Sequence, residues 1–175
     1  MMERFFPAKE AESAYGIPYE QWYRQGIRGV IFDIDNTLVP HGAPASRQAV
    51  SLFARLKRMG MKTCLLSNNR EPRVASFAAQ VDSPYIFKAG KPSVKGYERA
   101  MEQMGTGRDT TVFVGDQLFT DIYGANRTGI ASCLVKPIHP KEEIQIVLKR
   151  YLEAPMLYVY RRRRRKEAAR EREIR

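Results

Sequence analysis

Short apolar runs alternate with amphipathic stretches along most of the chain. The apolar runs are 30–34, 61–66, 85–87, 111–114 and 131–135. Runs of this kind are typical of strands that are buried on both faces of a parallel sheet. Stretches with helical spacing lie between and after them, at 46–59, 73–80, 93–104, 121–127 and 141–152. The alternation predicts a three-layer, Rossmann-like α/β fold. Helices cover both faces of a mostly parallel five-stranded sheet in such a fold.

Local signals set the boundaries of the first predicted helix. Ser46 is a predicted N-cap, because its hydroxyl can accept a hydrogen bond from the first helical turn. Val50, Phe53 and Leu56 form the expected apolar stripe, and Gly60 is expected to end the helix.

The segments on either side of the alternating region differ from it in composition. Residues 1–28 are rich in aromatic side chains and are interrupted by proline and glycine, which predicts short helical pieces packed on the core. Residues 29–152 are the predicted core domain. Residues 153–175 are a basic tail, and positions 161–175 alone carry nine basic and three acidic residues in a chain of net charge +11.

Composition narrows the class of protein. Hydrophobic residues make up 43% of the chain, and no stretch approaches the ~20 apolar residues that would span a bilayer. Charged residues interrupt the first 14 positions, so we expect no signal peptide and a cytoplasmic protein, with peripheral attachment to the inner face of the membrane as an alternative. Cys64 and Cys133 lie within apolar runs, which favours two buried thiols over a disulfide.

Polar side chains follow four of the five predicted strands. In chain order they are Asp33 and Asp35, then Ser67 and Asn68, then Lys91, and finally Asp116 and Asp121. Ligands of open α/β sheets bind at the carboxyl ends of the strands. We therefore expect these side chains to converge at one edge of the sheet.

The residue types in this set suit a phosphate ester and a metal ion. Asp33 and Asp35 are two residues apart, so an extended chain points both to the same side. With Asp116 they can surround one hard cation, and Mg²⁺ takes oxygen ligands while keeping water or phosphate oxygens in its shell. Such a cation, together with Lys91, would relieve the repulsion between the carboxylates.

The same residues resemble the four motifs of the haloacid dehalogenase (HAD) superfamily. The first motif, DxDx[TV], matches residues 33–37, and the Ser or Thr of the second matches Ser67. The lysine of the third motif commonly precedes proline, which favours Lys91 over Lys88. The fourth motif, GDxxxxD, matches residues 115–121. Within the superfamily the chain resembles subfamily IIIA and its YqeG-type members, which are similar to phosphatidylglycerophosphate phosphatases.

The resemblance implies a phosphatase and a role for each residue of the site. Asp33 is the implied nucleophile that forms an aspartyl-phosphate, and Asp35 is the implied acid and then base. Ser67 and Lys91 are implied to hold the phosphoryl oxygens. Asn68 has two interpretations, a contact with the phosphate or a side chain that closes a turn.

The resemblance also implies how the metal ion is held. Mg²⁺ is expected to bind Asp33, Asp116 and the backbone carbonyl of Asp35. Asp121 is expected to support the site by orienting Lys91 or a metal-bound water.

The spacing between the motifs bears on the substrate. Relatives often carry a cap domain, but the stretches from Asp35 to Ser67 and from Ser67 to Lys91 are filled by predicted core elements. We therefore expect no cap domain and an open site, which admits a bulky ester such as phosphatidylglycerophosphate. The alternatives are a phosphatase of small nucleotide or sugar phosphates, and a non-enzymatic protein with a vestigial site that binds RNA or an anionic surface.

The basic tail has three interpretations. It is a solvated, disordered extension, or a segment attracted to an anionic membrane, or, less favoured, a segment that binds nucleic acid. In the membrane interpretation the apolar residues 156–160 insert shallowly. The sequence predicts no oligomeric state.

Overall fold

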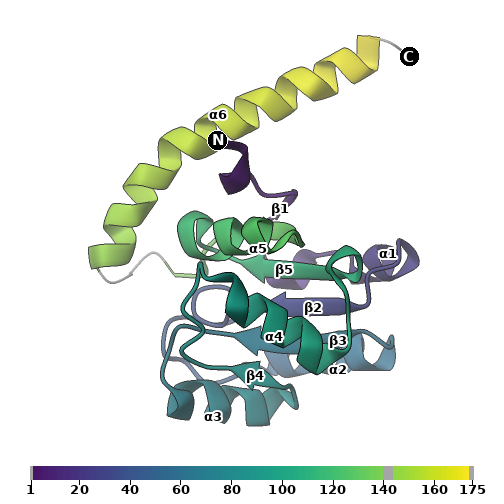
Figure 1. Cartoon of the computed structure of the whole chain (residues 1–175), viewed down its shortest axis with the longest axis vertical. Coiled ribbons are helices and arrows are strands. Elements are labelled where there is room, and N and C mark those ends of the chain that lie inside the picture. Colours follow the sequence, from purple (N-terminus) through teal and green to yellow (C-terminus); the bar gives the residue numbers. More distant parts are fainter. Residues whose placement is uncertain (1, 140–143, 174–175) are drawn as a thin grey trace.

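Six parallel strands form one sheet in the computed structural model, which describes residues 2–139 and 144–173 (Figure 1). The strands are β1 (Lys9–Ala11), β2 (Gly29–Phe32), β3 (Lys62–Leu66), β4 (Tyr85–Ile86), β5 (Thr111–Gly115) and β6 (Ala131–Val135). Their order is β1-β6-β5-β2-β3-β4, and each neighbouring pair is parallel. The order reverses between β2 and β5, and folds of this kind bind ligands outside the strand ends at that switch point.

The prediction of five strands was wrong, because β1 had been assigned to short helical structure. It has three residues, only one of them apolar, and pairs with β6 at the edge of the sheet. A polar strand of this length carries no apolar run, so only its pairing with β6 defines it.

Helices cover both faces of the sheet, which confirms the three-layer prediction (Figure 1). They are α1 (Tyr19–Arg24), α2 (Arg47–Arg58), α3 (Glu71–Val81), α4 (Val94–Met104), α5 (Tyr123–Thr128) and α6 (Ile144–Glu173). Short 3-10 helices lie at η1 (Met2–Phe5), η2 (Ala14–Gly16) and η3 (Arg108–Thr110). Alternate residues of β2 reach different layers: Val30 and Phe32 pack with α2 and α3, whereas Ile31 packs with α4 and α5.

Helix α2 begins where the sequence predicted, and Phe53 and Leu56 of its predicted apolar stripe are buried. The Ser46 hydroxyl accepts a hydrogen bond from the Ala49 N–H at 3.1 Å, which confirms the N-cap, and Gly60 follows the helix end. Val50 is 42% exposed, so its place in the apolar stripe was wrong. The buried residues are Ala49, Leu52, Phe53 and Leu56, which share one face at helical spacing.

The two cysteines are free and lie in core clusters on opposite faces of the sheet, as the preference for buried thiols predicted. Burial raises the pKa of the Cys64 thiol, and likewise that of Cys133, to about 12. Both thiols are therefore protonated and unreactive at neutral pH.

The basic tail continues the last helix. The sequence predicted a helix at 141–152, whose first residues lie outside the described part of the chain, and then a separate tail. In the structure α6 runs unbroken to Glu173 and extends past the sheet (Figure 1), so disorder over 161–173 was a wrong interpretation. The described side chains from 161 to 169 are exposed, as expected for a solvated segment.

The middle of α6 packs on the domain. Met156 and Leu157 contact a buried cluster formed by Leu118, Ile122 and Leu134. Tyr160 is buried against Phe6, with ring centroids 5.3 Å apart. Most of the segment expected to enter a membrane therefore faces the protein, and only Tyr158 and Val159 of this segment are exposed. Among the described residues no helix combines the length and the apolar character needed to cross a membrane.

Candidate active site

A buried lysine joins two carboxylates that come from different strand ends. The Lys91 Nζ lies 2.6 Å from the Asp33 Oδ1 and 2.7 Å from the Asp121 Oδ1. Asp33 follows β2, Lys91 follows β4, and Asp121 lies in the short helix η4 (Leu118–Ile122) that follows β5. All three residues are buried. The convergence expected from the sequence is present for this set.

Asp116, at the end of β5, reaches Asp33 through a shared hydroxyl. The Thr37 Oγ1 lies 3.2 Å from the Asp33 Oδ2 and 3.1 Å from the Asp116 Oδ1. Carboxylate oxygens of Asp33, Asp116 and Asp121 lie within 4.8 Å of one another. Three hard oxygen donors at this spacing fit a divalent cation such as Mg²⁺. The Asp121 carboxylate thus joins the clustered acids, whereas the sequence had Asp35, through its main chain, as the third ligand.

The charges of this cluster perturb one another. Burial raises the pKa of Asp33 to about 7 against the opposing effect of the Lys91 ammonium, and the carboxylates of Asp121 and Asp35 add to the rise. Burial by itself would lower the pKa of Lys91, but the neighbouring carboxylates of Asp121 and Asp33 hold it above its usual range. The arrangement favours a bound positive charge next to Asp33.

The Asp35 carboxylate is held by three donors. Its Oδ1 accepts hydrogen bonds from the Arg73 guanidinium at 2.9 Å and from the Gly42 N–H at 2.8 Å. Its Oδ2 accepts a hydrogen bond from the Asn69 amide at 2.6 Å. Arg73 lies on α3 and Asn69 follows β3, so two further elements orient this carboxylate.

Asn68 connects two loops of the site. Its Nδ2 donates to the Lys91 carbonyl at 3.3 Å, and its Oδ1 accepts from the Lys91 N–H at 2.8 Å. Ser67 is buried, and its hydroxyl accepts a hydrogen bond from the Asn69 N–H at 3.2 Å. Asn68 therefore positions the main chain of Lys91, and the substrate contacts expected of Ser67 and Asn68 stay predictions. Lys88, the competing lysine, is exposed.

The turn that carries Asp121 is a π-helix. The sequence predicted a helix at 121–127. In the structure the helical segment begins at Leu118 with η4 and continues as α5. The Tyr97 hydroxyl lies 3.0 Å from the Thr120 carbonyl and 3.1 Å from that of Asp121, and it can donate to either. Single turns of π-helix are frequent at functional sites, where the wider turn changes the direction of a side chain.

Two glycines make room for Asp121 and for the tyrosine beneath it. A Cβ on Gly115 would lie 2.5 Å from the Asp121 Oδ2, and one on Gly124 would overlap the Tyr97 ring. Gly124 therefore permits the close packing of α5 on Tyr97. Neither position has space for a larger residue without moving the site.

The substitution Gly115→Ala is expected to lower the free energy of unfolding by about 1–3 kcal/mol, because the added methyl group overlaps Asp121. Urea denaturation of both proteins measures the change. Gly107→Ala is the matched control, since the nearest atom to its Cβ would be 3.9 Å away. An equal loss in the two variants would contradict the argument.

Comparison with known proteins identifies the family. The chain is 33% identical over 165 residues to a Bacillus subtilis (strain 168) protein described as the probable phosphatase YqeG, and the match covers 93% of this chain and 96% of the relative. A family model described as haloacid dehalogenase-like hydrolase matches residues 47–129. The chain belongs to the haloacid dehalogenase-like hydrolases. The resemblance inferred from the motifs is therefore confirmed.

Other relatives of this HAD-like hydrolase are more distant. It is 26% identical over 152 residues to the chloroplastic/mitochondrial phosphatidylglycerophosphate phosphatase 1 of Arabidopsis thaliana, over 81% of this chain and 44% of the relative. The cobalt-bound form of the deoxy-D-mannose-octulosonate 8-phosphate phosphatase from Haemophilus influenzae superposes with a TM-score of 0.52 at 14% identity, over 63% of this chain and 69% of that one. The structural similarity to the Haemophilus influenzae phosphatase supports the assignment of the fold.

Several residues of the site, among them Thr37, Arg73 and Tyr97, had no role in the sequence-based interpretation. Thr37 is part of the first HAD motif, and the structure shows its hydroxyl between two carboxylates. Arg73 and Tyr97 lie within helices, where a polar group on one turn gives no sign of what it contacts. Only the packing of α3 and α4 on the sheet brings them to Asp35 and Asp121.

Proposed function

We propose that this hydrolase is a Mg²⁺-dependent phosphomonoesterase in which Asp33 becomes transiently phosphorylated. The carboxylate of Asp33, held between Lys91 and Thr37 and beside Asp116, is the observation that carries the proposal. A buried nucleophile flanked by a lysine and by potential metal ligands suits attack on a phosphate dianion. The phosphatase names of the relatives support the same reaction.

The first half of the reaction transfers the phosphoryl group to the protein. An oxygen of Asp33 attacks phosphorus, and the bond between phosphorus and the alcohol oxygen breaks. Asp35 gives a proton to the departing oxygen, so the alcohol leaves neutral. Ser67 and Lys91 hold the phosphoryl oxygens as the negative charge shifts between them.

The second half returns the protein to its starting state. A water molecule attacks phosphorus, and Asp35 takes a proton from that water. The bond between Asp33 and phosphorus breaks, which releases inorganic phosphate and restores both carboxyl groups. Arg73 and Asn69 keep Asp35 in the position that both proton transfers require.

We also propose which groups bind the metal ion. Asp33, Asp116 and the main-chain carbonyl of Asp35 would hold Mg²⁺, with Asp121 at hand to fix Lys91. When bound, the ion neutralises charge on the phosphoryl group.

A bulky phosphate ester of the phosphatidylglycerophosphate type is the proposed substrate. Between Asp35 and Lys91 the chain forms only α2, β3, α3, β4 and their loops, and no inserted domain covers the strand ends. The chain spans less than half of the Arabidopsis relative, and that relative's name supports this choice of substrate. Small nucleotide or sugar phosphates are the alternative substrates.

We further propose that the exposed basic face of α6 contacts an anionic membrane surface. Arginine and lysine side chains from 161 to 166 are exposed on this helix. Each basic residue near an anionic membrane contributes ~1 kcal/mol of attraction. Nucleic acid is the alternative partner for the same charges.

Phosphate release from a panel of esters tests the proposed function. The panel contains phosphatidylglycerophosphate in mixed micelles, a nucleoside monophosphate and a sugar phosphate, each with Mg²⁺ or with EDTA. We expect the largest kcat/KM for the lipid ester and a loss of roughly 100-fold or more in EDTA, because charge on the phosphoryl group is then uncompensated. Turnover that EDTA leaves unchanged would contradict the metal proposal, and a preference for the small esters would favour the alternative substrates.

A further inference from the structure

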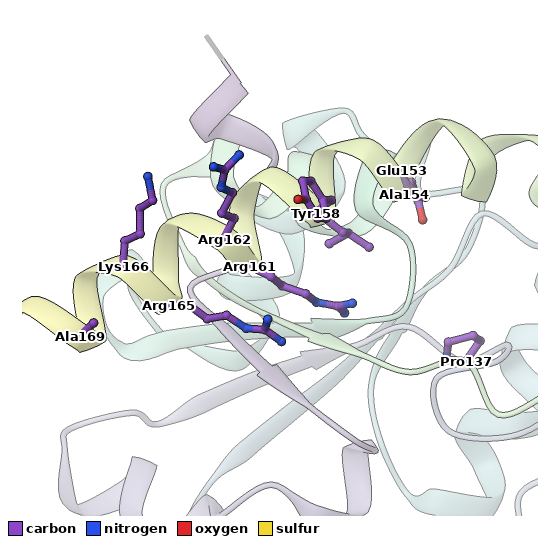
Figure 2. A pocket seen from close by; sticks show the side chains of 10 residues that line it. Pro137, Glu153, Ala154, Tyr158, Arg161, Arg162, Arg165, Lys166 and Ala169 are labelled. Carbon is purple, nitrogen blue, oxygen red and sulfur yellow. The ribbon is translucent and has the colours of Figure 1, made fainter.

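A groove of about 570 Å³ connects the active site to the basic helix. Asp116 lines it together with Arg161 and Arg165 of α6. Residues at the carboxyl ends of β1 and β6 line it as well. A second hollow of about 700 Å³ adjoins the first, because the two share Pro137 and several residues of α6 (Figure 2). A ligand bound at Asp116 could therefore extend as far as α6.

The two arginines reach from α6 toward the same side. Figure 2 shows Arg161 and Arg165 extending over the strands of the sheet, whereas Arg162 and Lys166 point away from them. Arg161 and Arg165 are four residues apart, which places them on one face of the helix. Their guanidinium groups are well shaped to bind a phosphate through two parallel hydrogen bonds.

Ion pairs among the described side chains engage Arg161 and leave Arg165 available to bind a phosphate. Arg161 lies 2.8 Å from Glu10, and Lys136 lies 2.6 Å from Glu12, so these four charges in the groove compensate one another. Arg165 makes no ion pair with the side chains described in 3–139 and 152–169. The Arg161 pair is partly exposed, and such pairs are weak enough for a phosphate to compete with the glutamate.

A buried contact fixes this helix relative to the active site. The carboxylate of Glu153, on α6, accepts a hydrogen bond from the Leu118 N–H at 2.9 Å. Leu118 begins η4, two residues after Asp116, so α6 is held directly to the loop that carries a proposed metal ligand. The helix that carries Arg165 is therefore anchored close to Asp116.

We infer that Arg165, assisted by Arg161, binds a second phosphate of the substrate while the phosphate to be removed lies at Asp33. The inference rests on the proposed function and narrows it to esters that carry two phosphate groups. The side chains of Leu157 and Tyr158 line the second hollow about one helical turn before Arg161 and suit the less polar remainder of such an ester. Arg165 is thus a specificity residue.

Two soluble substrates separate this role from membrane attraction. Glycerol 3-phosphate has one phosphate, and glycerophosphoglycerol phosphate has a monoester and a diester phosphate without acyl chains. We expect R165Q to lower kcat/KM for the second substrate about tenfold, mainly through KM, because a charge-assisted hydrogen bond is lost. Turnover of glycerol 3-phosphate should change less than about twofold. R164Q removes the same charge from α6 outside both hollows and should change neither.

Other outcomes would overturn the inference. Three results would show that Arg165 does not bind the second phosphate. They are equal losses on both substrates, no loss on either substrate, and an equal loss in R164Q. A loss confined to the acylated ester in anionic vesicles would assign Arg165 to the membrane surface instead. If the unmodified protein hydrolyses neither the soluble esters nor the acylated ester, the proposed function fails. Calorimetric binding of glycerophosphoglycerol phosphate then decides the inference separately, since R165Q should weaken it about tenfold and R164Q should not.

Discussion

Asp33→Asn is expected to abolish phosphate release, with kcat reduced at least about 10⁴-fold. Asn has nearly the shape of Asp but no negative oxygen to form the bond to phosphorus. The side chain sits between Lys91 and Thr37 in the structure, and no other carboxylate occupies that position between them. Release of inorganic phosphate from the best substrate of the panel, at saturating Mg²⁺, measures the change.

The control for this prediction is Asp109→Asn, which removes an exposed carboxylate on η3. It should leave turnover within about twofold of the unmodified protein. Full activity in Asp33→Asn would rule out the aspartyl-phosphate mechanism. A complementary result is expected from Asp35→Asn with p-nitrophenyl phosphate, whose leaving group needs no proton. A protein that cannot activate water should then accumulate the phosphorylated form, which intact-mass measurement detects.

Lys91→Met is expected to lower the free energy of unfolding by about 3–5 kcal/mol in the absence of metal, and turnover by roughly 100-fold or more. The substitution keeps the length of the side chain but removes the charge that holds Asp33 and Asp121 together. Those two carboxylates are buried, so they would then face each other without a counter-charge. Urea denaturation in EDTA measures the stability, and phosphate release measures the turnover.

A matched pair of variants tests the cause of this loss. Lys88→Met removes an exposed lysine from the same loop and should change stability by less than about 0.5 kcal/mol. Adding Asp121→Asn to Lys91→Met should recover part of the stability, because one of the two uncompensated charges is removed. If Lys91→Met were as stable as the unmodified protein, Lys91 could not be the group that compensates the buried acids.

Described residues of α6 couple this helix to the site. Glu153 links α6 to the loop after Asp116, and the cluster around Leu118 packs against Met156 and Leu157. Glu153 and Leu157 also line the groove that contains Asp116 and Arg165. A variant that disturbs this packing should therefore affect substrate selection as well as stability.

The sequence by itself determined the layered α/β fold and the strand ends that supply Asp33, Ser67, Lys91 and Asp116. Apolar periodicity and capping residues act within a few positions along the chain, so they can be recognised without knowledge of the fold. The order of the motifs then identified the family. Local patterns were misleading where a segment carries little apolar character, as in β1, and where a helix continues across a charged stretch, as in α6.

Only the tertiary structure decided how these pieces meet. It placed Asp121 against Lys91, brought Arg73 to Asp35, and turned Arg165 into the groove that begins at Asp116. The first two of these contacts join residues that are at least 30 positions apart. Their formation depends on the packing of helices on the sheet and on room made by residues such as Gly115, and no periodicity along the chain records that information.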